Sequence, residues 1–400
     1  MKRILYLRSD YSDVPLYGGS MVHMTGVINA LARRDVIVTA ALPFPFKHLS
    51  FDASVKLIRL KRPPIFPRFL WRITCFLGSL WYPWQLRKVI QKEAFDYIYY
   101  RYAFMDLTAV VLKWIFNIPI IMEYNGSEAW IDKELRPKGE IKFGWLASFV
   151  ERINLKSADH IIVVSDVLKD ELLQVGIDGC KILMNPNGVD TDEFDPKNCE
   201  DMRNKMRRNL NIEGKFVFCF VGSFSRWHGI NILERMVPEV VRENKRAHFL
   251  FIGDGEFRQN LERTMADRGL CGSVTFTGNV TYPNVRAYIA ASDVCLLPAQ
   301  SDVRKKYYCS PIKLFEYMSM EKPVIVSNLE QIAQVVDGPQ PCGFVVRYDM
   351  ADEFVKAARA LSDVAFSDYV QMGKSARNRV VNGYTWIGHV GRIIDFVQRN

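Results

Sequence analysis

The sequence predicts an α/β protein of two domains, each built on a doubly wound parallel sheet. The chain has 400 residues, which is more than a single hydrophobic core usually serves. Short apolar runs alternate with helical patterns in both halves, as expected of strand-helix-strand units. A polar, turn-rich stretch separates the halves. We therefore expect one domain over residues 1–190 and a second over 191–384.

The first half contains a complete set of strand-like runs, which predicts one Rossmann-like sheet. These runs are residues 3–8, 36–42, 55–60, 97–102, 118–124, 160–165 and 182–185. The second half repeats the plan and predicts a second sheet of the same kind. Its runs are residues 216–222, 248–253, 274–277, 294–298, 323–327 and 343–347.

The stretch between the two predicted sheets reads as a hinge. It begins with Asn-Pro-Asn-Gly-Val-Asp at 185–190 and continues through the polar residues 191–200. Pro, Gly and Asn favour turns over regular structure, so we expect a cleft to open here and domain closure to pivot on residues 187–196.

Composition is that of an ordinary globular protein, with 49% hydrophobic and 24% charged residues. The formal net charge is +9 and the isoelectric point is near 9.0, which favours an anionic partner. Lys and Arg are scattered and accompany no nucleic-acid-binding signature, so we expect no nucleic acid.

The eight cysteines are widely spaced, form no C-x-x-C pair and predict no zinc site. Several lie inside apolar runs, and Met1-Lys2-Arg3 leads into a strand-like run in place of a signal peptide. We therefore expect reduced thiols and a cytoplasmic location.

One segment, residues 63–91, breaks the alternation because it is both aromatic and basic. Arg72 and Pro83 interrupt its apolar stretch, which is too short to span a bilayer. The segment could lie in a membrane interface, which would make the protein peripheral on the inner face of the plasma membrane. Alternatively, its aromatic residues pack beneath the first sheet.

Glycine-containing loops before helices are the first candidate chemistry. Gly18 and Gly19 precede a helical pattern running to Arg33, where backbone N–H groups could face anionic oxygens. The alternative for this glycine pair is a plain tight turn. In the second half, residues 218–230 read as a strand, a loop with Gly222, Arg226 and His228, and a helix. This order outlines a diphosphate cradle.

A second helix start lies at residues 310–318, after the strand-like run ending at Pro298. Lys313 could neutralise phosphate, and Glu316 could accept hydrogen bonds from ribose hydroxyls. By themselves the two residues could equally be a solvated pair on a helix face.

The stretch Ser-Pro-Ile-Lys-Leu-Phe-Glu-Tyr-Met-Ser-Met-Glu-Lys-Pro-Val-Ile-Val-Ser at 310–327 resembles the donor-binding signature of a large enzyme family. These are the retaining GT-B glycosyltransferases of family 4, or group 1, which assemble bacterial polysaccharides and glycolipids. Further similar motifs follow the family's order and cover almost the whole chain: YGGS at 17–20, NPNGVD at 185–190, VGSF and WHG within 221–229, and IGDG at 252–255.

The resemblance implies retaining transfer from a UDP- or GDP-linked sugar, with no catalytic metal and no other cofactor. It implies that a C-terminal helix, residues 385–400, packs back on the first domain. It also implies that Glu316 binds ribose and that the loop 310–313 contacts phosphate and sugar. The donor-binding set carried over is Gly19, Gly222, Ser223, Gly229, Gly253, Gly278, Ser310, Pro311, Ile312, Leu314 and Glu316.

The chain departs from the family pattern at several positions. Tyr308 stands where many relatives have a first glutamate, and Ser223 and His228 replace the usual Arg and Lys of the phosphate loop. Arg226 or Lys313 must then supply permanent positive charge, while His228 could donate hydrogen bonds to the diphosphate or be a structural loop residue.

In the first domain Asn125 stands where relatives place a sugar-contacting histidine. An amide can bond a hydroxyl but is no general base, which suits front-face transfer assisted by the leaving phosphate. The alternative for Asn125 is a turn at a strand end. The predicted catalytic residues are Asn125, Arg226, His228 and Lys313, and the acceptor-side candidates are Gly18, His23, Arg101 and Glu123.

Two other functions remain open on the same architecture: a nucleotide-sugar epimerase and a noncatalytic nucleotide-sugar or glycan-binding protein. A nicotinamide dehydrogenase is disfavoured because neither loop carries the dinucleotide glycine fingerprint. The expected partners are a nucleotide-sugar donor, a glycan or lipid-linked acceptor, and a membrane surface contacted through residues 63–91.

Overall fold

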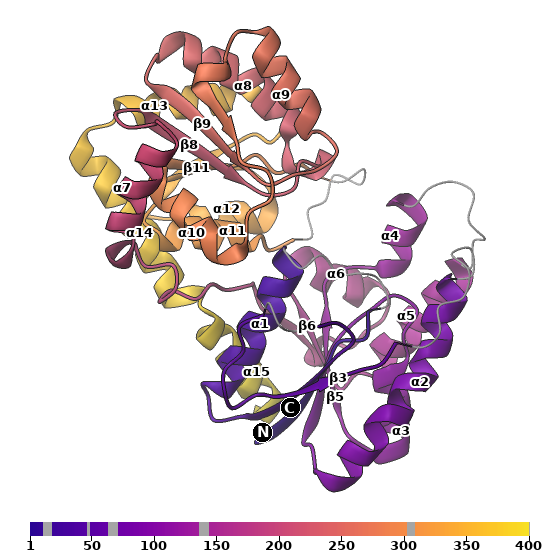
Figure 1. Ribbon diagram of the computed structural model, residues 1–400. Helices are drawn as coiled ribbons and strands as arrows, with labels where there is room; N and C mark the ends of the chain where they lie inside the picture. The colour runs from indigo at the N-terminus through magenta and orange to yellow at the C-terminus, as the bar shows by residue number, and fades with distance from the viewer. Residues whose placement is uncertain (11–17, 46–48, 63–70, 136–143, 302–308, 400) are drawn as a thin grey trace. The chain divides into compact units, whose positions relative to one another are not determined.

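The computed structural model describes residues 1–10, 18–45, 49–62, 71–135, 144–301 and 309–399 (Figure 1). The chain divides into two compact units. Within the described residues, the first contains residues 1–10, 20–186 and 386–399, and the second contains Gly18, Gly19 and residues 187–385. The division therefore lies at Pro186, shortly before the predicted boundary at residue 190.

The first unit is built on a seven-stranded sheet in which every pair is parallel, in the order β3-β2-β1-β4-β5-β6-β7. Its inner strands are almost wholly buried because helices cover both faces, which explains why they read as continuous apolar runs, whereas the edge strands β3 and β7 are more exposed. The strands are β1 (Arg3–Leu7), β2 (Ile37–Leu42), β3 (Lys56–Arg59), β4 (Tyr97–Arg101), β5 (Ile120–Tyr124), β6 (His160–Val163) and β7 (Ile182–Met184).

The helices of the first unit lie on both faces of this sheet. Figure 1 shows α1 and α15 on one side and α2, α3 and α5 on the other. The helices are α1 (Gly19–Ala32), α2 (Trp71–Lys92), α3 (Thr108–Phe116), α4 (Glu128–Leu135), α5 (Gly144–Ser157), α6 (Asp166–Gln174) and α15 (Trp386–Arg399), with a short η2 (Gly179–Lys181).

The second unit has a six-stranded sheet, again wholly parallel, in the order β10-β9-β8-β11-β12-β13. Its strands are β8 (Phe216–Val221), β9 (Ala247–Ile252), β10 (Val274–Phe276), β11 (Val294–Leu297), β12 (Val324–Ser327) and β13 (Gly343–Val346). All thirteen predicted runs therefore contain a strand, and the predicted fold class is confirmed.

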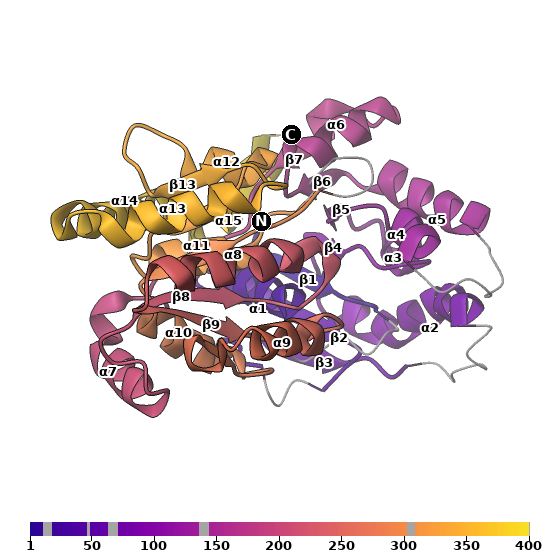
Figure 2. The ribbon, with the colours of Figure 1, turned by 90° about the horizontal axis from the view of Figure 1, so that it is seen from above.

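Two hydrophobic clusters cover the faces of the second sheet. One is formed with α8 (Ile230–Glu243), α9 (Arg258–Asp267) and α13 (Ala351–Asp363), and Figure 2 shows α8 and α13 side by side. The other is formed with α10 (Tyr282–Ala291), α11 (Ile312–Ser319), α12 (Glu330–Val336) and α14 (Phe366–Gly383). The remaining elements are η3 (Pro196–Asn198), α7 (Glu200–Asn209), η4 (Arg226–His228) and η5 (Cys271–Ser273).

The C-terminal helix α15 belongs to the first unit, as the resemblance implied. The Trp386 ring lies against α1 so closely that a Cβ on Gly26 would be 2.5 Å from it. The imidazole of His23 meets the same ring edge-on, with centroids 5.2 Å apart. Arg34 Nε donates to the carbonyl of Ile387 at 3.0 Å. Packing of Trp386 against α1 and the hydrogen bond from Arg34, just after α1, thus join the two helices.

Helix α2 contains most of the aromatic, basic segment; residues 63–70 lie outside the described residues. One stripe of the helix, including Cys75, Tyr82 and Leu86, is buried. The other stripe leaves Leu80 and Trp84 more than half exposed. One face of α2 thus packs in the core, and the other faces outward, so membrane contact stays a prediction. Among the described helices, none is long and apolar enough to cross a membrane.

Candidate active site

In the second unit, the loops that follow β8, β9 and β10 meet through their backbones at three glycines. Gly222 donates from N–H to the carbonyl of Ile252, and Gly253 donates to the carbonyl of Gly278, both at 2.9 Å. A Cβ on Gly253 would lie 2.1 Å from the Gly222 carbonyl oxygen, so no side chain fits there. The carboxyl ends of parallel strands are where α/β proteins bind ligands, so we expect a ligand to bind at this backbone-lined edge.

Lys313, in the first turn of α11, reaches this edge. Its Nζ atom is buried and has no hydrogen-bond partner among the described residues. It lies against the Gly222 backbone, 2.6 Å from where a Cβ would stand, and 4.9 Å from the centre of the Phe220 ring. Burial lowers the pKa of Lys313 to about 8. An unpaired buried ammonium is costly, so this atom is prepared for an anion.

Tertiary packing holds α11 in this position. The Val221 N–H, at the end of β8, donates to the Tyr317 hydroxyl oxygen at 2.8 Å. Leu314 and Phe315 are fully buried in the core. The prediction that Leu314 binds the donor is therefore not supported for its side chain, which packs beneath the sheet.

Glu316 lies one turn along α11, and its carboxylate is buried. It accepts a hydrogen bond from the Tyr282 hydroxyl at 2.9 Å. Burial raises the pKa of Glu316 to about 7, and the Tyr282 bond acts in the opposite direction. Sequence reasoning missed Tyr282 because this residue lies on α10, in a different part of the chain, and only the fold brings the two together.

His228 lies beside Lys313 in the loop after β8. Its Nδ1 is 2.6 Å from the carbonyl oxygen of Ser223 and 2.9 Å from the Ser223 hydroxyl. A carbonyl can only accept, so Nδ1 carries the hydrogen and Nε2 of the neutral ring is an acceptor. The nearby Lys313 charge, and then burial, lower the pKa of His228 to about 3. The ring of His228 is therefore uncharged near neutral pH, whereas Lys313 and the exposed Arg226 carry positive charge.

Two further predicted residues, Gly229 and Ser310, make contacts that hold the backbone in place. Gly229 begins α8 with φ +63°, and a Cβ there would lie 1.7 Å from the Pro298 carbonyl oxygen. Ser310 is buried, and its hydroxyl accepts from the Asn187 N–H at 3.0 Å. The Asn187 amide in turn donates to the Ser310 carbonyl at 2.6 Å. Pro311 and Ile312 follow at the start of α11, so this contact sets where the helix begins.

In the first unit, Glu123, Arg101 and His23 form a closed cluster. The Arg101 guanidinium pairs with Glu123 Oε1, and His23 Nδ1 is 3.4 Å from Oε2. Burial, and then Arg101, lower the pKa of His23 well below its usual value, so its ring is neutral. Glu123 and His23 are 1% and 2% exposed. The prediction that these two contact an acceptor directly is therefore not supported, because they face each other inside the unit.

Asn125 is the member of this group that reaches the surface of the unit. It follows β5, is half-buried, and its amide donates to Glu123 Oε1 at 2.6 Å. Gly18 and Gly19 lie elsewhere, at the amino end of α1, where Gly18 has φ +138° and a Cβ would meet nothing within 4 Å.

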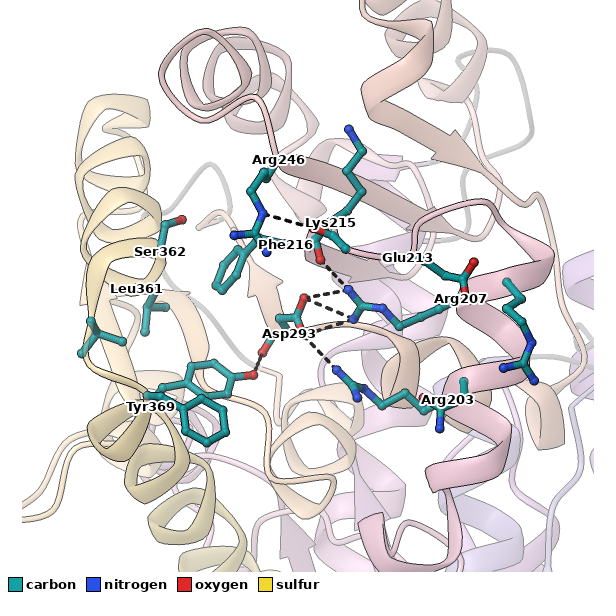
Figure 3. Close-up of a pocket in the computed structure, with 15 residues that line it drawn as sticks. Arg203, Arg207, Glu213, Lys215, Phe216, Arg246, Asp293, Leu361, Ser362 and Tyr369 are labelled. Atoms are coloured by element: carbon teal, nitrogen blue, oxygen red, sulfur yellow. Dashed lines mark hydrogen bonds and ion pairs between the residues drawn. The ribbon is translucent and has the colours of Figure 1, made fainter.

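A hollow of about 520 Å³ lies at the opposite, amino-terminal edge of the second sheet (Figure 3). Its most buried charges are satisfied internally. Arg207 bonds the Ala291 carbonyl at 2.9 Å and Asp293 Oδ1 at 3.2 Å, and Asp293 also accepts from the Val217 N–H at 2.8 Å. This arrangement joins α7, β8 and β11, and we interpret it as a structural joint. In the described part of the chain, no cluster of His, Cys, Asp and Glu side chains could hold a metal ion.

Comparison with known proteins yields two family matches. Residues 17–193 match the family described as Glycosyltransferase Family 4, and residues 215–363 match Glycosyl transferases group 1. Together the matches cover most of the chain, including α11 from Ile312 to Ser319 and the loops after β5 and β8.

Curated relatives are distant but consistent. An alpha-D-kanosaminyltransferase of Streptomyces kanamyceticus is 20% identical over 62% of this chain and 62% of its own length. The chain thus spans less than two thirds of that relative. The UDP-Gal:alpha-D-GlcNAc-diphosphoundecaprenol alpha-1,3-galactosyltransferase of Escherichia coli is 24% identical, over 78% of this chain and 77% of its own.

Solved structures share the fold over the full length. Anabaena HepE in complex with UDP aligns with a TM-score of 0.73 and 16% identity, covering 100% of both chains. A sucrose-phosphate synthase from Thermosynechococcus elongatus aligns with a TM-score of 0.75 and 20% identity, covering 100% of this chain and 99% of the other. The two family matches, on a fold of two parallel-sheet units, establish that the chain belongs to the group 1, or family 4, glycosyltransferases and is a transferase enzyme.

Proposed function

We propose that the enzyme is a retaining glycosyltransferase that moves a sugar from a UDP- or GDP-linked donor to a hydroxyl of a glycan or lipid-linked saccharide, without a metal ion. The observation that carries the proposal is the Nζ of Lys313, which is buried beside the Gly222 backbone and has no hydrogen-bond partner in the described part of the chain. An anion bound there would restore the ammonium to its ordinary charged state.

In this proposal the diphosphate and the ribose of the donor contact different residues of the second unit. The diphosphate lies over Gly222, where Lys313 and the exposed Arg226 supply positive charge. The ribose hydroxyls donate to the Glu316 carboxylate, which Tyr282 already orients. Preorganised charge of this kind stabilises the transition state, because it faces the place where negative charge develops.

The reaction we propose needs no protein base. The acceptor oxygen forms a bond to the anomeric carbon on the face from which the nucleoside diphosphate departs. The bond between that carbon and the phosphate oxygen breaks, and the acceptor proton passes to the departing phosphate. Lys313 and Arg226 stabilise the charge left on the diphosphate. Asn125, as an amide, binds the sugar and cannot remove the proton.

Relatives support the choice of substrates. One curated relative is named for a UDP-galactose donor and a diphosphoundecaprenol-linked acceptor, and another for a GDP-mannose donor and a phosphatidylinositol mannoside acceptor. The Anabaena structure contains UDP. We therefore propose either UDP or GDP as the donor nucleotide, and lipid-linked saccharides are the first acceptors to assay.

The test of the donor site is thermal stabilisation by a panel of UDP-, GDP-, ADP- and dTDP-sugars. A ligand that binds only the folded protein raises the unfolding midpoint. We expect one donor to stabilise the wild type, and Glu316→Ala to lose that response. Glu239→Ala is the matched control, because this half-buried carboxylate lies on α8 of the same unit and pairs with Arg242. Equal responses of wild type and Glu316→Ala would rule out the assigned site.

Turnover tests the chemistry. With the selected donor and lipid-linked acceptors, NMR of the product should show the same anomeric configuration as the donor. A chelator should leave the rate unchanged. An inverted product would refute retention, and a rate lost to the chelator and restored by a divalent cation would refute metal independence.

We also propose that the outer face of α2 lies on an anionic membrane surface. Leu77, Leu80, Trp81 and Trp84 are 38% to 57% exposed on this face. Arg87 stacks on the Trp84 ring at 5.5 Å, which places a positive charge beside an exposed aromatic side chain. Apolar and aromatic side chains next to basic ones are typical of helices that lie in the membrane interface.

Sedimentation with vesicles tests the membrane proposal. The wild type should bind vesicles with anionic lipid more strongly than neutral ones, and Leu80→Gln with Trp84→Gln should weaken binding. Phe366→Gln is the control, since Phe366 is 80% exposed on the second unit. If the control and the α2 variant lose binding equally, α2 is not the contact.

A further inference from the structure

The carboxylate of Glu123, at the end of β5, is surrounded by hydrogen-bond donors. Oε1 accepts from the Arg101 guanidinium and from the Asn125 amide, the latter at 2.6 Å. Oε2 lies 3.5 Å from the Tyr99 hydroxyl, which donates to it. The carboxylate is 1% exposed, so these protein groups provide its surroundings in place of water.

This environment decides which way the Asn125 amide faces. A carboxylate paired with a guanidinium is ionised and can only accept. The NH₂ group of Asn125 must therefore face Glu123, and its Oδ1 must face away. The opposite orientation would place two oxygens 2.6 Å apart in a buried setting, which is strongly unfavourable. A turn that needed only a polar residue would not require this orientation.

The outward oxygen is unengaged. Asn125 is half-buried, and within the described residues no donor reaches its Oδ1. The buried ion pair of Arg101 and Glu123 therefore fixes the direction in which the Asn125 Oδ1 acceptor points. An amide oxygen is neutral, so it accepts from a hydroxyl without repelling a nearby diphosphate, as a carboxylate would.

We infer that Glu123 is a positioning residue that fixes the Asn125 amide with Oδ1 outward, so that Asn125 recognises one sugar hydroxyl as a hydrogen-bond donor. This inference rests on the proposed function, because the hydroxyl belongs to the transferred sugar. Arg101 pairs with Glu123 and acts through it. The group thus selects for a hydroxyl at one ring position, whichever sugar the donor carries.

A first measurement examines the orientation without any turnover. Side-chain ¹⁵N labelling of asparagine, with the Asn125→Ala variant for assignment, gives the NH₂ signals of Asn125. Because one proton is bonded to Glu123, those signals should exchange slowly with water in the wild type and faster in Glu123→Gln. If Glu123→Gln fails to fold, the Arg101→Gln, Glu123→Gln double variant, which removes both charges of the pair, takes its place. Equal exchange in wild type and variant overturns the inference even if the enzyme proves active.

A second measurement examines recognition. Deoxy and deoxyfluoro donor analogues both lack the hydroxyl proton, whereas fluorine still accepts weakly. At one ring position both analogues should be poorer substrates than the parent donor. Their kcat/KM should fall by the same factor, roughly 3- to 10-fold, which is the range for one neutral hydrogen bond. Asn125→Ala should no longer distinguish the analogues from the parent. A deoxyfluoro donor that retains full kcat/KM at every position contradicts the assigned acceptor role.

The double-mutant cycle separates positioning from a purely structural role. Glu123→Gln should lower kcat/KM in the wild-type background and have little further effect in Asn125→Ala. Equal factors in both backgrounds would show that Glu123 acts only through stability. Absence of any turnover with every donor and acceptor refutes the proposed function, and with it the sugar-recognition step, while the exchange measurement still decides the orientation.

Discussion

The ammonium of Lys313 lies 4.9 Å from the centre of the Phe220 ring and is buried without a hydrogen-bond acceptor among the described residues. A ring face attracts a cation but does not replace the hydrogen bonds that water would provide. Burial of this ammonium is therefore unfavourable, and an anionic ligand at the proposed donor site would relieve that cost.

Removing that charge should stabilise the protein and weaken donor binding. In Lys313→Met, an apolar chain of similar length replaces the unpaired ammonium. We expect the free energy of unfolding at pH 7.5 to rise by about 1 to 3 kcal/mol, the usual cost of an unsatisfied buried polar group. The apparent affinity for the donor should fall at least about tenfold, since a charge-assisted bond to phosphate is lost. Denaturant unfolding with and without donor measures both.

Lys322→Met is the matched control for this prediction. Lys322 is also a lysine whose pKa is lowered by burial, but its Nζ donates to the Ala290 and Ser292 carbonyls at 3.0 and 2.7 Å. Its replacement leaves two carbonyls without their donor and should destabilise the protein while donor affinity is retained. If Lys313→Met also destabilised the protein, the Lys313 ammonium would be a structural group.

Stability without donor should pass through a minimum between about pH 7 and 8. Burial raises the pKa of Glu316 from 4.5 to about 7, so its contribution is present below pH 4.5 and is lost as the pH rises to 7. Burial lowers the pKa of Lys313 from 10.5 to about 8, so stability is regained as the pH rises from 8 to 10.5. Unfolding midpoints measured across this range, relative to Glu316→Gln with Lys313→Met, isolate the two groups.

Donor binding should show the opposite dependence. It needs the Glu316 carboxylate for ribose and the Lys313 ammonium for diphosphate, so affinity should be greatest near pH 7 to 8 and fall on both sides. Titration calorimetry at several pH values checks this. A flat profile from pH 6 to 9 would remove at least one of the two groups from the donor site.

The Tyr282 hydroxyl should set the acid limb of that profile. Its bond to Glu316 favours the carboxylate, so Tyr282→Phe should raise the pKa of Glu316 above about 7 and shift the acid limb upward. Loss of one hydrogen bond should also cost about 0.5 to 1.5 kcal/mol of stability. Tyr288→Phe, on the same helix, is the control and should leave the profile unchanged. An unshifted limb in Tyr282→Phe would mean that the bond does not influence Glu316 in solution.

The strands were predictable because parallel strands buried on both faces are continuous apolar runs, as β8 is with Phe-Val-Phe-Cys-Phe-Val. Lys313 and Glu316 were predictable because their spacing on one helix belongs to a local motif. Partners supplied by tertiary structure were not. Tyr282 contacts Glu316 across 34 positions of sequence, and nothing near Tyr282 indicates this contact.

Burial explains why three predicted site residues have side chains that face the interior. Glu123 and His23 are polar residues near a strand end, a pattern that suggests a ligand site. Whether such a side chain points outward or into a cluster depends on residues from other elements, here Arg101 of β4. Leu314 lies within the binding motif but on its core-facing side. A local pattern identifies the motif, whereas the direction of each side chain is set by what packs around it.

The contact of Gly26 with Trp386 makes the anchoring of α15 testable. A Cβ on Gly26 would lie 2.5 Å from the indole, so Gly26→Ala must displace Trp386 and should cost about 1 to 3 kcal/mol. Gly144→Ala is the control, because a Cβ there meets nothing within 4 Å and alanine is the better helix former. We expect Gly26→Ala to lower the denaturation midpoint and to speed proteolytic cleavage near residue 386, while Gly144→Ala is neutral or slightly stabilising. Unchanged cleavage in Gly26→Ala would show that the hydrogen bond from Arg34 to Ile387 holds the helix without the indole contact.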